Sequence, residues 1–101
     1  MMKTGLAFFL YILFISCNSG QPAGDQSLNG KTIFKSYCVS CHGIDGSLMT
    51  NGAKDLRTSE LNLDERILVI TKGRNIMSSF ENTLSKNQIK AVAEYTLQLK
   101  Q

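Results

Sequence analysis

Apolar residues recur at helical spacing in three separate segments of the chain. The first segment covers residues 28–37 and has Ser27 in position to cap it. The second covers residues 62–73 and the third residues 85–97, and both open with a capping box, in which the cap and the residue three positions on bond each other's backbone. No stretch alternates like a β-strand, so the pattern predicts an all-α fold.

The core face of each predicted helix follows from the same spacing. Residues 43–59 are rich in Gly, Asn, Asp, Ser and Thr and are expected to form a loop, pinned by Leu48, Ala53 and Leu56. Gly73 stands where a helix usually stops. The residues expected in the core are Leu28, Ile33, Phe34 and Tyr37, then Ile67, Leu68 and Ile70, then Ile89, Val92, Ala93, Thr96 and Leu97.

The first residues of the chain have the pattern of an export signal. Lys3 is followed by an unbroken apolar run over residues 5–15, which is shorter than the roughly 20 residues that span a membrane. The small residue Ser16 and then Cys17 resemble the lipobox of bacterial lipoproteins. That resemblance implies that Cys17 becomes the first residue and carries a lipid, whose acyl chains hold the protein on a membrane. Cleavage by an ordinary signal peptidase, which leaves Cys17 removed or as a stray thiol, is the alternative.

Length and composition fit one compact domain. The chain has 101 residues, of which 43% are apolar and 19% charged. We expect a signal peptide at 1–16, a flexible tether at 17–27, and one folded domain at 28–101. About 75 residues are few for a purely hydrophobic core, and a covalent cofactor in the centre would resolve this difficulty.

The charge pattern argues against nucleic acid as a partner. Without Lys3, ten Lys and Arg residues stand against eight Asp and Glu residues, and they form no clustered basic stripe. The sequence also has no nucleophile paired with a base and no recognisable pair of carboxylates. We therefore expect neither catalysis nor a small-molecule substrate.

The most informative residues are Cys38-Val39-Ser40-Cys41-His42. Two thiols three positions apart can each add across one vinyl group of a haem, and the next histidine can then bind the iron. This spacing predicts one covalent haem c, attached at Cys38 and Cys41, with His42 as an axial ligand.

Three other uses of these cysteines compete with haem attachment. A structural zinc site needs four ligands, and no Cys or His follows His42. A thioredoxin-type redox pair needs a βαβ context, and no strand pattern surrounds the motif. A plain disulfide between Cys38 and Cys41 remains possible, although so short a loop constrains little of the unfolded chain.

An electron-transfer haem usually has a sixth iron ligand, and a second histidine is excluded because His42 is the only one, so the methionines are the candidates considered. Met1 and Met2 leave with the signal, so the candidates are Met49 and Met77. Met49 follows His42 by seven residues, whereas Met77 lies 35 residues on, in a loop long enough to reach the other face of a haem. We expect Met77 to be the second axial ligand.

From about Ser27 to Leu99 the chain resembles the class I (mono-haem) cytochromes c. The resemblance implies a cytochrome c-like fold of three to four helices around one covalent haem, which carries single electrons between membrane or periplasmic redox partners through an exposed haem edge. The export signal and the lipobox at Cys17 imply a location on the outer, periplasmic side of a membrane. Besides the haem pentapeptide, the matching positions are Gly30, Phe34, Val92, Tyr95, the segment 51–56, and Met77-Ser78-Ser79-Phe80.

The chain departs from this family at two loop positions. Lys54 and Ser78 stand where prolines are common, so both loops lose a residue that restricts φ. We therefore hypothesise that Met77 is displaced from the haem iron at high pH and that a residue such as Lys72 replaces it. The cations that are candidates for docking a partner are Lys35, Lys54, Lys72 and Arg74.

Three other functions share these residues. One is the electron-entry haem subunit of a membrane oxidase, reductase or dehydrogenase, for which the site would be identical. A five-coordinate haem sensor requires that Met77 not bind iron. A lipoprotein without haem requires a disulfide between Cys38 and Cys41.

Overall fold

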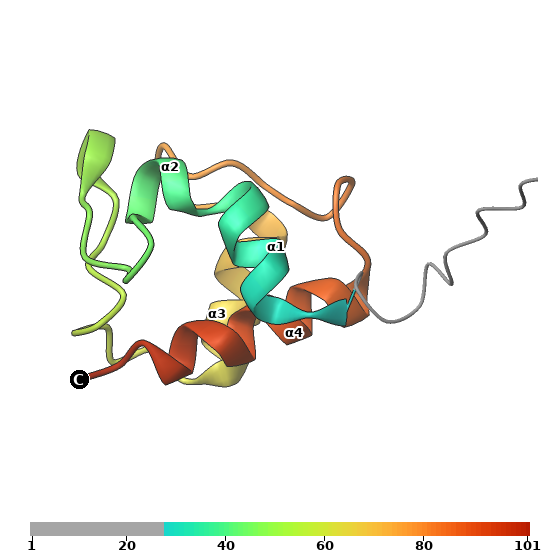
Figure 1. Cartoon of the computed structure of the whole chain (residues 1–101). Coiled ribbons are helices and arrows are strands. Elements are labelled where there is room, and N and C mark those ends of the chain that lie inside the picture. Colours follow the sequence, from blue (N-terminus) through green and yellow to red (C-terminus); the bar gives the residue numbers. More distant parts are fainter. Residues whose placement is uncertain (1–27) are drawn as a thin grey trace, which may run out of the picture.

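The computed structural model describes residues 28–101, and they form the helical domain that the hydrophobic pattern predicts (Figure 1). Within this range there is no β-strand, and no helix is long and apolar enough to cross a lipid bilayer. The predicted signal peptide, lipobox and tether at 1–27 lie outside the described residues. The elements are α1 (Gly30–Tyr37), α2 (Val39–His42), the 3-10 turn η2 (Thr50–Gly52), α3 (Leu63–Lys72) and α4 (Lys86–Gln98).

The two predicted capping boxes are confirmed. Asn62 caps α3 and Ser85 caps α4, each with reciprocal hydrogen bonds to the residue three positions on. The predicted cap of the first helix is wrong, because α1 begins at Gly30 and its cap is Asn29, whose side chain accepts a hydrogen bond from the Thr32 backbone at 3.1 Å. One of the free backbone N–H groups in the first turn of α1 therefore finds its acceptor in a neighbouring side chain.

Helices α1 and α4 cross at a glycine. A Cβ at Gly30 would fall on the carbonyl oxygen of Ala91 and lie 2.9 Å from the Cβ of Tyr95, so only glycine allows this approach. One turn further on, the rings of Phe34 and Tyr95 pack with centroids 5.3 Å apart and planes at 54°. The positions that match the family, Gly30 and Phe34 in α1 and Tyr95 in α4, therefore meet at this crossing.

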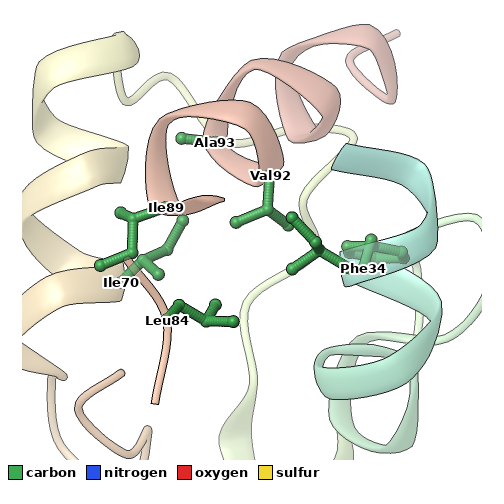
Figure 2. Close-up of a cluster of buried hydrophobic side chains, with 7 residues drawn as sticks. Phe34, Ile70, Leu84, Ile89, Val92 and Ala93 are labelled. Atoms are coloured by element: carbon green, nitrogen blue, oxygen red, sulfur yellow. The ribbon is translucent and has the colours of Figure 1, made fainter. Parts of the chain in front are cut away.

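The core lies where α1, α3 and α4 meet. Figure 2 shows Val92 of α4 beside Phe34 of α1, with Ile89 of α4 close to Ile70 of α3. Phe34 and Val92 are completely buried, and Leu84 from the loop before α4 completes the same cluster. This cluster is small for a domain of this length.

The face that α3 turns inward differs from the prediction. Ile70 is buried as expected, but Leu68, also expected in the core, is 60% exposed, and Arg66 is only 4% exposed. Leu28 and Tyr37 of the first segment, also expected in the core, are exposed. The inner face of α3 therefore carries a cation beside its apolar residues.

The loop at 43–59 has the expected irregular structure with one 3-10 turn, η2. Of its three expected anchors only Leu56 packs against the core, and Leu48 is exposed. The backbone N–H of Leu56 donates to the carbonyl of Gly46 at 2.9 Å. This contact fixes the loop beside α2.

Candidate haem site

The two cysteines lie on a single helical turn. The backbone N–H of Cys38 donates to the Phe34 carbonyl at 2.9 Å and ends α1, and that of His42 donates to the Cys38 carbonyl at 3.0 Å. Positions three apart share a helix face, so Cys38 and Cys41 point the same way, and both line one cavity. Both are free thiols, so no disulfide joins them.

The two thiols differ in their surroundings. Cys38 is partly buried against the core, and this burial, together with the neighbouring Cys41, raises its pKa to about 11. Cys41 is exposed. At neutral pH the Cys38 thiol therefore stays protonated.

His42 is held by a backbone carbonyl. Its Nδ1 lies 3.0 Å from the carbonyl oxygen of Lys54, so Nδ1–H donates and Nε2 keeps its lone pair for a metal. Partial burial lowers the pKa of His42, which favours the neutral ring that a metal needs. The family's usual proline is replaced by Lys54, yet the carbonyl at this position is still present for the hydrogen bond.

Met77 lies in a loop that is tightly tied to α3. Gly73 ends the helix at φ 75°, and a Cβ there would lie 2.5 Å from the Met77 carbonyl oxygen. Two backbone hydrogen bonds, of 3.2 and 3.0 Å, pair Arg74 with Met77. Phe80 then donates its backbone N–H to the Ile70 carbonyl at 3.0 Å, so both ends of the loop are anchored to α3.

One cavity brings the predicted residues together. It has a volume of about 430 Å³. Its walls hold Cys38, Cys41, His42 and Met77 together with apolar side chains. The apolar lining consists of Phe34, Ala53, Leu56, Leu61, Val69, Ile70, Ile76 and Phe80.

These residues fit a haem. Protein interiors hold few voids larger than a water molecule, so a cavity of this size inside so small a domain is a binding site. Two thiols can attach a porphyrin, the imidazole and the thioether can bind its iron, and the apolar walls suit its faces.

Some of the other candidate residues line this cavity and others do not. Met49 is 62% exposed and does not line the cavity, in contrast to Met77. Of the candidate docking cations, Lys54 and Arg74 line the cavity, whereas Lys72 pairs with Glu81 at 2.9 Å. Lys35 is exposed on α1, away from the cavity lining, and Cys17 lies outside the described residues.

Sequence reasoning missed Arg66, which also lines the cavity. Arg66 stands four positions before the buried Ile70, and residues four apart share a helix face. This spacing is the signal that could have placed Arg66 beside the core.

Known proteins resemble the chain along most of its length. Residues 25–95 match the family described as cytochrome c oxidase, cbb3-type, subunit III. A cytochrome c6-like protein of Nostoc sp. strain PCC 7120 is 31% identical over 103 aligned residues, which cover 96% of this chain and 90% of that protein.

Solved structures agree. Cytochrome c6C of Synechococcus sp. PCC 7002 superposes with a TM-score of 0.64 at 29% identity, covering 76% of this chain and 96% of that one. Cytochrome c6 of the diatom Phaeodactylum tricornutum superposes with a TM-score of 0.61 at 30% identity, covering 74% and 93%. The chain belongs to the class I (mono-haem) cytochrome c family, and as a c-type cytochrome it binds one covalent haem c and carries electrons.

Proposed function

We propose that the chain is an exported electron carrier whose haem c is attached at Cys38 and Cys41, with His42 and Met77 as axial iron ligands. The observation that carries this proposal is that all four side chains line one cavity of about 430 Å³. His42 and Met77 are 35 residues apart in sequence, so only the fold brings them to the same space.

The choice of Met77 over Met49 rests on position. Met77 is partly buried, packs against the core and lines the cavity, whereas Met49 is largely exposed. A thioether that ligates iron must lie inside the haem site, and only Met77 meets this condition among residues 28–101.

Haem c, when bound, supplies a reversible one-electron couple between Fe(III) and Fe(II). The chain's own residues tune this couple. His42 keeps Nε2 free through its bond to the Lys54 carbonyl, and Met77 offers a soft thioether that favours Fe(II). The apolar walls also exclude water from the haem. Methionine ligation and this burial together raise the reduction potential above that of a haem with two nitrogen ligands. The carrier then suits oxidising partners.

Electrons leave this site through a brief contact with another redox protein. Cys41 is exposed, and Ile76, on the cavity lining beside Met77, is 75% exposed, so the cavity opens to solvent near these residues. Small interfaces are usual for weak redox encounters. Lys54 and Arg74 at the same lining give the opening a positive charge, which attracts an acidic partner surface. We propose no catalytic role, no small-molecule substrate and no nucleic acid partner.

A lipid on Cys17 is proposed to hold the protein on the outer, periplasmic side of a bacterial membrane. Support comes from the apolar run at 5–15, the small residue before the cysteine, and a polar tether to residue 27. Cys17→Ser is expected to move the protein from the membrane fraction to the soluble fraction, with the haem retained. A Cys17→Ser protein that stays with the membranes would contradict the lipid anchor.

Haem attachment is tested by extraction. The protein is expressed with a cytochrome c maturation system, extracted with acid acetone, and its pyridine spectrum is recorded. Retained haem with a c-type spectrum is expected, and Cys38→Ser and Cys41→Ser should each shift this spectrum because one vinyl group remains. Cys17→Ser is the matched control and should leave the spectrum unchanged. Complete loss of haem from the wild-type chain would refute the proposal.

A second candidate is the electron-entry subunit of a membrane oxidase, reductase or dehydrogenase. The description of the matched family, a cbb3-type oxidase subunit, favours it. Membranes solubilised in mild detergent and separated on a native gel distinguish the two functions. The haem c signal migrates at the size of the small chain if it is a free carrier, and at that of a large complex if it is a stable subunit.

A further inference from the structure

Arg66 is a buried cation whose hydrogen bonds all go to neutral groups. It stands on α3 with only 4% of its surface exposed. Its Nε donates to the Leu61 carbonyl at 2.8 Å, Nη2 to the Ser59 carbonyl at 3.0 Å, and Nη1 to the Thr96 hydroxyl at 3.0 Å. Arg66 takes part in none of the ion pairs among residues 28–101.

This arrangement leaves a charge and two donors without partners. A guanidinium carries five N–H groups, and the three hydrogen bonds of Arg66 use three of them. Burial lowers the pKa of Arg66, yet an arginine side chain stays protonated in proteins. A buried charge is costly unless an opposite charge meets it, so the structure calls for an anion beside this side chain.

The cavity that Arg66 lines has a positive wall. Lys54, Arg66 and Arg74 belong to its lining, and no Asp or Glu does so among the described residues. The other titratable side chains of the lining are Tyr37, Cys38, Cys41 and His42. A ligand that carries carboxylates is therefore complementary to this site.

Haem c carries two propionates, on the edge of the porphyrin opposite the vinyl groups. In the proposed attachment the vinyl edge would be held by Cys38 and Cys41 beside α2, which lies at the top of Figure 1. Arg66 is near the start of α3, and the Thr96 that it contacts is near the end of α4. Helix α4 and the start of α3 lie at the bottom of the same view. The propionate edge and Arg66 therefore belong to the same end of the cavity.

We propose that Arg66 binds a haem propionate with its two remaining N–H groups and keeps that carboxylate ionised. The inference rests on the proposed attachment of haem at Cys38 and Cys41. The three existing hydrogen bonds hold the guanidinium in place before the carboxylate arrives, so binding requires little reorganisation. A paired, ionised propionate does not titrate near neutrality, so the reduction potential stays level there.

The direct test is a crystal structure of the haem-loaded wild-type protein, after its pyridine spectrum has established covalent haem. A propionate oxygen within about 3.2 Å of Nη1 or Nη2 of Arg66 is expected. Both propionates lying beyond hydrogen-bonding distance of Arg66 would overturn the inference and leave the proposed function intact. A protein without covalent haem would overturn the proposed function instead.

A second test measures the reduction potential of haem-loaded variants from pH 5 to 8. In Arg66→Gln the propionate loses its counter-charge and titrates in this range. Its potential should then fall as pH rises, by up to a tenfold change in the ratio of reduced to oxidised protein, or about 59 mV. The wild type and the rescue variant Arg66→Lys should stay level.

The matched control is Arg57→Gln, which removes the same charge from a partly exposed arginine paired with Asp55, outside the cavity lining. It should leave the potential level across the pH range. An Arg66→Gln protein that is only less stable, with a level potential, shows that Arg66 merely ties the loop to α4 and overturns the inference. If Arg66→Gln fails to take up haem, the distance between Arg66 and the propionates in the wild-type crystal structure decides whether the inference holds.

Discussion

The crossing of α1 and α4 offers the sharpest test of the fold, through the substitution Gly30→Ala. The added methyl carbon would overlap the Ala91 carbonyl oxygen and come within 2.8 Å of the Ala91 carbonyl carbon. These are backbone atoms of α4, which no change of side-chain rotamer can move. The two helices must therefore separate.

The cost of this separation follows from three contributions. Overpacking of a well-packed contact costs about 1–3 kcal/mol. The loosened pair Phe34–Tyr95, with centroids at 5.3 Å, loses part of about 0.5–1.5 kcal/mol. The higher helix propensity of alanine returns about 0.5–1 kcal/mol. The net loss is about 2 kcal/mol, a large part of the roughly 5–15 kcal/mol that stabilises a typical domain.

The assay is thermal unfolding of the haem-loaded protein, followed by far-ultraviolet circular dichroism. For a domain of this size, about 2 kcal/mol lowers the Tm by about 8–16 °C. Lys35→Ala, at an exposed position of the same helix, is the control and should shift the Tm by no more than a few degrees. If Gly30→Ala has the same Tm as Lys35→Ala, the reasoning that glycine is needed for the close approach of the two helices is refuted.

Three further predictions concern the iron ligand and a surface carboxylate. Met77→Ala should abolish the near-infrared band of methionine bound to iron and lower the potential, because the soft ligand is lost. Met49→Leu, on the exposed loop, should change neither, and the opposite pattern would assign the ligand to Met49. Gly73→Ala places a Cβ 2.5 Å from the Met77 carbonyl oxygen at a φ of 75°, so an alkaline titration should lose the same band at lower pH than in the wild type; an unchanged midpoint argues against a coupled loop. Arg57 hydrogen bonds hold the pKa of Asp55 below its usual range, so their stabilisation is present above the unfolded pKa of about 3.9 and is lost as pH falls through the folded pKa. In Arg57→Gln the pKa of Asp55 should rise toward the ordinary value in a carbon-13 NMR titration, and an unmoved titration curve would show that Arg57 does not set it.

Features that depend on a few neighbouring residues were predictable from the sequence. The capping boxes at Asn62 and Ser85 need only a cap and a partner three positions on, and both are present in the structure. The cap of α1 lies two positions after the predicted Ser27, at Asn29. Asn29 and Ser27 are both good caps, and the close packing of Gly30 on α4 decides where the helix starts.

Features that depend on the cavity were not predictable from periodicity. In α3 the pattern places both Leu68 and Ile70 inside; Ile70 is buried, but the helix turns Arg66 inward and leaves Leu68 exposed. A helix face that borders a charged cofactor carries polar side chains, so its hydrophobic pattern is weakened there. The pattern also could not rank the environments of Cys38 and Cys41, which depend on how α1 packs.

The unequal burial of the two thiols has a consequence for biosynthesis. In the folded domain Cys38 packs against the core and its pKa is raised to about 11, so it is a poor nucleophile and is shielded from a large attaching enzyme. If haem is attached at both cysteines as proposed, the bond to Cys38 is favoured while α1 is still open and the thiol is accessible. Loading the cofactor onto the unfolded polypeptide and then enclosing the completed thioether by folding is the order of maturation that this burial favours.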